Sequence, residues 1–80
     1  MQNTPEIKDE KLTKYLRKDN FYKFFQNYVK CYKGMKNEMT EIVANYREIP
    51  ISKARNIRNF KYPEVQKFIA VNDFKTLFVA

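Results

Sequence analysis

The sequence contains no histidine and a single cysteine, Cys31. One cysteine cannot form a disulfide within the chain, and the absence of histidine excludes the usual Cys/His zinc sites. Histidine is also the commonest general base of enzymes. We therefore expect a protein that is not an enzyme and that has no cofactor and no metal site. A lone thiol fits a reducing cell interior, so the expected location is cytoplasmic.

Glycine and long apolar segments are equally scarce. With one glycine in 80 residues, the sequence has no glycine-rich loop of the kind that cradles phosphates. The longest apolar runs, 68–71 and 77–80, are too short to span a bilayer. The polar start of the chain, with Glu6, Asp9 and Glu10, is unlike a signal peptide. We expect no membrane partner.

Charge and aromatic side chains are abundant instead. Charged residues make up 31% of the chain, and seven Phe and six Tyr contribute to a hydrophobic share of 44%. This share is enough to build a core, and 80 residues are enough for one small domain, 1–80. The net charge of +7 favours an anionic partner.

The strongest pattern in the sequence is a heptad repeat of apolar residues between positions 21 and 49. Its members are spaced alternately by four and three: Phe21, Phe25, Tyr28, Tyr32, Met35, Met39, Ile42, Tyr46 and Ile49. This spacing predicts one long amphipathic helix, about 20–49. A hairpin centred on Gly34 is the alternative, and the unchanged phase of the repeat at Met35 favours the continuous helix.

Such a helix would be about 45 Å long. The rest of an 80-residue chain has difficulty covering a seam of that length. A second copy of the chain is therefore expected to cover part of it, as a homodimer.

Shorter helices are predicted on either side. Thr4 and Pro5 resemble the start of a helix, and Pro50 must end the long one. Ser52 is expected to cap a short helix, and a further helix is expected from Pro63. The core positions predicted for these two helices are Ala54, Ile57, Phe60, Val65, Phe68 and Ile69. Residues 73–80 fit a helix or a strand, and the absence of a second strand favours a helix. The predicted fold class is therefore all-α, a small helical bundle built on the long helix.

Cys31 lies between Lys30 and Lys33 and beside the heptad seam. It is either a thiolate activated by lysines or a small buried hydrophobic residue. The second interpretation is favoured, because no base for the thiol can be named.

Two groups of basic and amide residues are candidates for binding. Residues 11–37 carry eight Lys and Arg against Asp19, and the helix face opposite the seam presents Lys23, Asn27, Lys30 and Lys33. The second group lies farther along the chain and comprises Lys53, Arg55, Arg58, Lys61 and Tyr62. Such cations contact phosphates, and a neighbouring aromatic ring can stack on an unpaired base. For the lysine face a merely solvated surface is the alternative, and for Tyr62 it is packing against the core.

These observations predict a small, basic binding or regulatory protein that contacts nucleic acid through its Lys/Arg surface. The alternative is an adaptor or inhibitor that docks on an acidic surface of a larger protein, because Tyr and Arg also suit protein interfaces. The pattern does not separate DNA from RNA.

Overall fold

Helices form the part of the chain that the structure, a computed structural model, describes, namely residues 9–74. Their order is α1 (Asp9–Leu12), the 3₁₀ turn η1 (Thr13–Tyr15), α2 (Lys18–Phe25), α3 (Tyr32–Arg47), α4 (Ile51–Ala54) and α5 (Tyr62–Val71). Within these residues, Arg17 and Asn59 form an isolated antiparallel β-bridge. The predicted fold class, an all-α small helical bundle, is confirmed.

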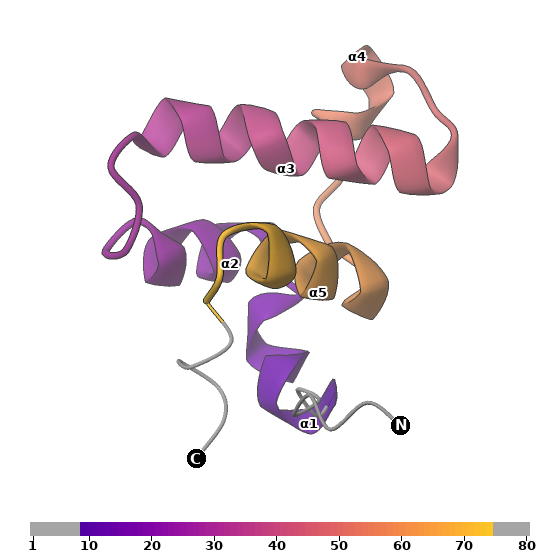
Figure 1. The fold of residues 1–80 in the computed structure, drawn as a ribbon. Helices are drawn as coiled ribbons and strands as arrows, with labels where there is room; N and C mark the ends of the chain where they lie inside the picture. The colour runs from indigo at the N-terminus through magenta and orange to yellow at the C-terminus, as the bar shows by residue number, and fades with distance from the viewer. Residues whose placement is uncertain (1–8, 75–80) are drawn as a thin grey trace, which may run out of the picture.

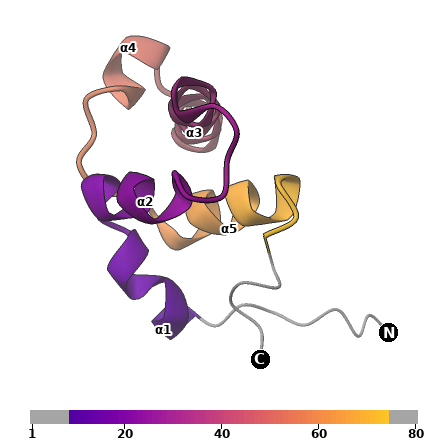
Figure 2. The same cartoon turned by 90° about the vertical axis from the view of Figure 1, so that its left-hand side faces the viewer.

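The helices are arranged in levels. Figure 1 shows α3 lying above α2 and α5, with α1 below them. Figure 2, which views α3 nearly end-on, shows α2 and α5 side by side in the middle level and α4 beside α3 in the upper level. The segment after α4 returns from this upper level to the level of α2 and α5.

The core lies between these levels and is rich in aromatic rings. The ring of Phe21 lies 4.6 Å from that of Phe25, 4.9 Å from that of Phe60 and 5.1 Å from that of Phe68, measured between centroids. These contacts join α2, α5 and the segment before α5. Burying such rings contributes most of the stabilisation of a small domain, about 1.5–3 kcal/mol for each fully buried side chain. The core also contains Leu12, Met35, Met39, Val43, Ala54, Val65 and Ile69.

The prediction of one continuous helix over about 20–49 is wrong. Helix α2 ends at Phe25, α3 begins at Tyr32, and residues 26–31 form the turn between them. The Asn27 side chain donates hydrogen bonds to the carbonyl oxygens of Lys23 (3.5 Å) and Phe24 (3.2 Å), which satisfies carbonyls at the end of α2. The turn does not lie at Gly34 either, because Gly34 is in the first turn of α3.

The break changes which heptad positions are buried. Phe21, Phe25, Met35 and Met39 are core residues, as predicted. The tyrosines of the seam are exposed instead, with exposed fractions of 47% for Tyr28, 46% for Tyr32 and 51% for Tyr46. Within α3 the buried face continues through Val43 and Ala44, because a straight helix of 3.6 residues per turn drifts away from a heptad seam.

The second half of the chain follows the sequence prediction more closely. Helix α3 ends before Pro50, and α5 begins at Tyr62 with Pro63 in its first turn. Ala54, Phe60, Val65, Phe68 and Ile69 are buried, and Ile57 is half-buried. The predicted cap at Ser52 is wrong: Pro50 is the N-cap of α4, and Ser52 lies inside that helix.

The predicted burial of Cys31 is also wrong. Cys31 is exposed and extended, with φ −132°, and it is the N-cap of α3. Its Sγ accepts a hydrogen bond from the backbone N–H of Gly34 at 3.3 Å. The thiol thus takes the place of the Ser or Asp oxygen that usually caps a helix.

The predicted helix start at Thr4 and Pro5 lies outside the described residues. So does most of the segment 73–80, for which a helix was favoured; of its two described residues, Asp73 lies in the turn after α5 with φ 59°, and Phe74 is in neither helix nor strand. The homodimer was expected because one apolar seam would be too long for a single chain to cover. That reason does not apply to residues 9–74, since α2 and α3 are separate helices. Among these residues no helix has both the length and the apolar composition that crossing a membrane requires.

Candidate functional site

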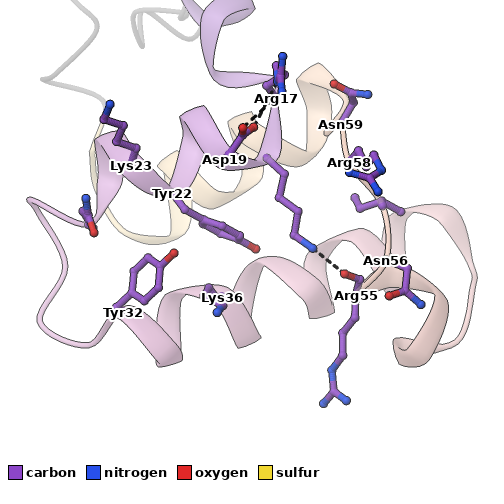
Figure 3. Close-up of a pocket in the computed structure, with 13 residues that line it drawn as sticks. Arg17, Asp19, Tyr22, Lys23, Tyr32, Lys36, Arg55, Asn56, Arg58 and Asn59 are labelled. Carbon is purple, nitrogen blue, oxygen red and sulfur yellow. Dashed lines mark hydrogen bonds and ion pairs between the residues drawn. The ribbon is translucent and has the colours of Figure 1, made fainter.

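A groove of about 780 Å³ opens between α2, the first turns of α3 and the segment 55–59. Figure 3 shows Tyr22 and Tyr32 near one another between α2 and α3, and Arg58 and Asn59 on the wall that the segment 55–59 forms. We call this site the basic groove. Its lining residues are Arg17, Lys18, Asp19, Tyr22, Lys23, Gln26, Tyr32, Lys36, Arg55, Asn56, Ile57, Arg58 and Asn59.

Positive charge dominates the basic groove. Six of its lining residues are Lys or Arg, and among the described residues that line it Asp19 is the one carboxylate. Asp19 pairs with Arg17, whose Nε lies 3.3 Å from Oδ1 and whose Nη2 lies 3.4 Å from Oδ2. The hydrogen bonds from the Arg17 guanidinium hold the pKa of Asp19 below its usual value. The lone carboxylate therefore stays ionised and compensates Arg17 rather than the lysines.

Lys18 lies at the centre of this charge distribution. Partial burial lowers the pKa of its ammonium, and the positive charges of Lys36 and Arg58 lower it further. Its Nζ donates a hydrogen bond to the carbonyl oxygen of Arg55 at 2.5 Å. A backbone carbonyl offsets part of the desolvation of an ammonium but leaves its charge uncompensated. The fold thus holds Lys18 of α2 close enough to Lys36 of α3 and to Arg58 of the segment 55–59 for each of them to repel its charge.

The wall formed by the segment 55–59 is fixed by backbone hydrogen bonds. The N–H of Lys18 donates to the carbonyl of Arg58 at 2.9 Å, and the N–H of Phe60 donates to the carbonyl of Leu16 at 2.6 Å. Arg47 adds a third connection, because its Nη2 donates to the carbonyl of Asn59 at 2.9 Å. The backbone that carries Arg58 is therefore tied to the start of α2 and to α3.

Two tyrosines line the side of the groove between α2 and α3. Their rings meet edge to face, with centroids 6.1 Å apart, and the Lys36 Nζ lies 5.1 Å from the centroid of the Tyr32 ring. Tyr22 is almost fully buried, and burial raises the pKa of its hydroxyl to about 12. At neutral pH that hydroxyl is protonated and can donate a hydrogen bond to an anion.

Three of the binding residues suggested by the sequence line the basic groove: Lys23, Arg55 and Arg58. Lys23 comes from α2, whereas Arg55 and Arg58 come from the segment after α4. The two sequence candidates, far apart along the chain, thus meet at one site in the fold. Figure 3 shows the Arg55 side chain directed away from Arg58, so Arg55 lies at the rim.

The other suggested residues lie elsewhere. Asn27 caps α2, Lys30 lies in the turn at 26–31 and Lys33 lies in the first turn of α3, so the lysine face of a single helix does not exist. Tyr62 is half-buried and packs against the hydrophobic core, which is the alternative given for this residue, and its hydroxyl lies 3.1 Å from Oγ1 of Thr13. Lys53 and Lys61 are exposed but do not line the groove.

Sequence reasoning did not single out Arg17, Lys18, Lys36, Tyr22 or Tyr32 as site residues. Arg17, Lys18 and Lys36 belong to the basic segment 11–37. A count of charges along the chain does not show which basic side chains come together in the fold. The heptad pattern predicts that Tyr32 lies in the buried seam. The participation of the two tyrosines in a groove follows from the turn at 26–31, which brings the start of α3 opposite α2.

A comparison of the chain with protein-family models, with curated proteins and with solved structures found no match. Among residues 9–74 no three Cys, Asp or Glu side chains are grouped closely enough to hold a metal ion.

Proposed function

We propose that this protein is a non-enzymatic nucleic-acid-binding protein of the cell interior, and that the basic groove contacts the phosphate backbone. The observation that carries the proposal is the convergence of Lys18, Lys36 and Arg58 from three separate segments, with the one lining carboxylate already paired to Arg17. The negative charge of a bound polyanion would offset the repulsion of Lys18 by Lys36 and Arg58, so the fold favours an anion at this site.

Phosphate groups suit the chemistry of the groove. Lysine ammonium groups act as compact point charges, whereas the Arg58 guanidinium offers a planar fork that binds two phosphate oxygens. The side chains of Asn56 and Asn59, on the same wall, can donate to phosphate, sugar or base edges. Several positive charges along one groove match the regularly spaced charges of a nucleic-acid backbone.

The test is a binding measurement by fluorescence anisotropy at about 50 mM and about 200 mM salt, the range over which phosphate contacts weaken steeply. The groove variant replaces Lys18, Lys36 and Arg58 by Gln. The control variant replaces Lys30, Lys33 and Lys53 by Gln, which removes the same net charge from exposed positions outside the groove.

The wild type is expected to bind labelled oligonucleotides at low salt. The groove variant should lose about tenfold or more in affinity and about two units of salt slope, since about three phosphate contacts disappear. The control should lose much less. Equal losses in both variants would show that net charge alone acts, and undetectable wild-type binding at low salt would reject the proposed function.

An acidic protein surface is the second candidate partner, and the exposure of Tyr32 in the groove favours it, since Tyr and Arg are frequent at interface hot spots. In that case the wild type binds no oligonucleotide, and the groove variant loses a protein partner instead. Binding to a protein interface with an aromatic centre should also depend less on salt.

A further inference from the structure

The basic groove is a hollow, and this shape bears on which form of nucleic acid it accepts. Proteins that read duplex DNA insert a helix or a ribbon into a groove about 12 Å wide and about 8.5 Å deep. The cations Lys18, Lys36 and Arg58 line an inward-curving site, flanked by α2, by α3 and by the segment 55–59. A single strand can lie along such a hollow with both its phosphates and its unpaired bases against the lining, whereas a duplex, whose bases are stacked and paired, meets the cations through its phosphates alone.

Tyr32 supplies the second requirement of single-strand binding, an aromatic ring on which a base can stack. Its side chain is 46% exposed although it lines the groove. The ring contacts that of Tyr22 at a steep angle, 79°, and the Lys36 ammonium lies 5.1 Å from its centroid. An aromatic ring held beside cations, and not buried in the core, is typical of sites that combine base stacking with phosphate contacts.

The rest of the lining is compatible with unpaired bases. Gln26, Asn56 and Asn59 carry both donors and acceptors, and in a single strand the base edges are free to meet them. The groove volume of about 780 Å³ suits a short stretch of chain.

We propose that the basic groove binds single-stranded nucleic acid in preference to a duplex, with a base against Tyr32 and phosphates on Lys18, Lys36 and Arg58. This inference rests on the proposed function and adds the form of the substrate to it. It assigns Tyr32 a role separate from that of the cations: the cations provide affinity for any phosphate backbone, and Tyr32 provides the preference for unpaired bases.

The experiment compares a labelled oligothymidylate and an oligouridylate of about twelve nucleotides, within the usual range of single-strand site sizes, with a duplex of the same length. The proteins are the wild type, Tyr32→Ala and Tyr46→Ala. Tyr46 is the matched control, since it is an exposed tyrosine of the same helix that lies outside the groove.

The wild type is expected to bind a single strand about tenfold or more tightly than the duplex. Tyr32→Ala should lower single-strand affinity at least about fivefold and leave duplex affinity and salt slope unchanged, whereas Tyr46→Ala should change neither. Wild-type binding of the duplex as tightly as the single strands would overturn this inference and leave the proposed function standing. If neither form binds, the proposed function fails as well. The wild-type comparison decides even if Tyr32→Ala does not fold.

Discussion

Arg47 forms a bidentate ion pair with the fully buried carboxylate of Glu64, with Nε to Oε2 at 2.6 Å and Nη2 to Oε1 at 3.0 Å. Oε1 also accepts a hydrogen bond from the backbone N–H of Lys61 at 2.8 Å. The pair joins the last turn of α3 to the first turn of α5. Through its bond to Asn59, Arg47 also fixes the wall of the basic groove.

Replacing Glu64 by Gln should lower the free energy of unfolding by about 3–5 kcal/mol. Removing one partner of a buried pair leaves the other charge without compensation, which costs more than the intact pair contributes. Urea unfolding followed by circular dichroism measures this loss. Glu41→Gln, on the exposed side of α3, is the control and should change stability by less than about 0.5 kcal/mol. A similar small change for Glu64→Gln would show that the pair is not buried.

Met39→Asp and Tyr32→Asp should behave differently, although both residues belong to one heptad pattern. Met39 is fully buried, so a carboxylate there has no water and no partner, and the variant should not fold. Tyr32 is 46% exposed, so Tyr32→Asp should fold. Thermal unfolding of both variants tests whether the turn at 26–31 leaves Tyr32 exposed while Met39 stays in the core. If Tyr32→Asp is also unfolded, Tyr32 is not the exposed residue that the turn at 26–31 makes it.

The sequence predicted the class of fold and much of its core, because apolar spacing and Pro50 act locally. It did not predict the turn at 26–31. A turn that needs positive φ is marked by glycine, but among residues 9–74 positive φ occurs at Glu48 and Asp73 and nowhere in this turn. The heptad spacing of apolar residues also continues through the turn without a change of phase. The usable signal was Asn27, a residue that readily ends a helix by bonding its last carbonyls.

Gly34→Ala should stabilise the protein by about 0.4–1 kcal/mol. Gly34 lies in the first turn of α3 with negative φ, and an added Cβ would lie 3.5 Å from both Cβ and Sγ of Cys31, an ordinary contact. Alanine therefore fits the folded state and reduces the conformational freedom of the unfolded chain. The urea midpoint of the variant gives the size of this gain. A loss of stability would show that the start of α3 requires glycine.

Tyr22 should make stability depend on pH in the alkaline range. Its pKa is about 12 in the folded protein against 10.0 for an ordinary tyrosine, so the folded state keeps a proton that the unfolded state loses. The stabilisation is complete below pH 10 and disappears as the pH rises towards 12. Urea midpoints of wild type and Tyr22→Phe over this range test the effect. The midpoint of the variant should fall less steeply, and identical slopes would exclude a buried Tyr22 hydroxyl.

The candidate site was predicted less well than the fold, for a physical reason. Lys23, Arg55 and Arg58 were identified from local charge, but Lys18 and Lys36 reach the groove only because α2, α3 and the segment 55–59 meet in space. Charge along a chain does not encode such a meeting. Glu64 illustrates the same limit, because nothing beside it in the sequence indicates that Arg47 lies opposite it.

The most direct test of the basic groove as a nucleic-acid interface is an NMR titration of the ¹⁵N-labelled protein with a short single-stranded oligonucleotide at low salt. The largest shift changes are expected at the amides of Lys18, Tyr22, Tyr32, Lys36 and residues 55–59. Amides around Tyr46 of α3 and Lys67 of α5, which line a separate depression between these two helices, serve as the internal control and should stay unchanged. Changes centred on Tyr46 and Lys67, or no changes at all, would contradict the assignment of the basic groove.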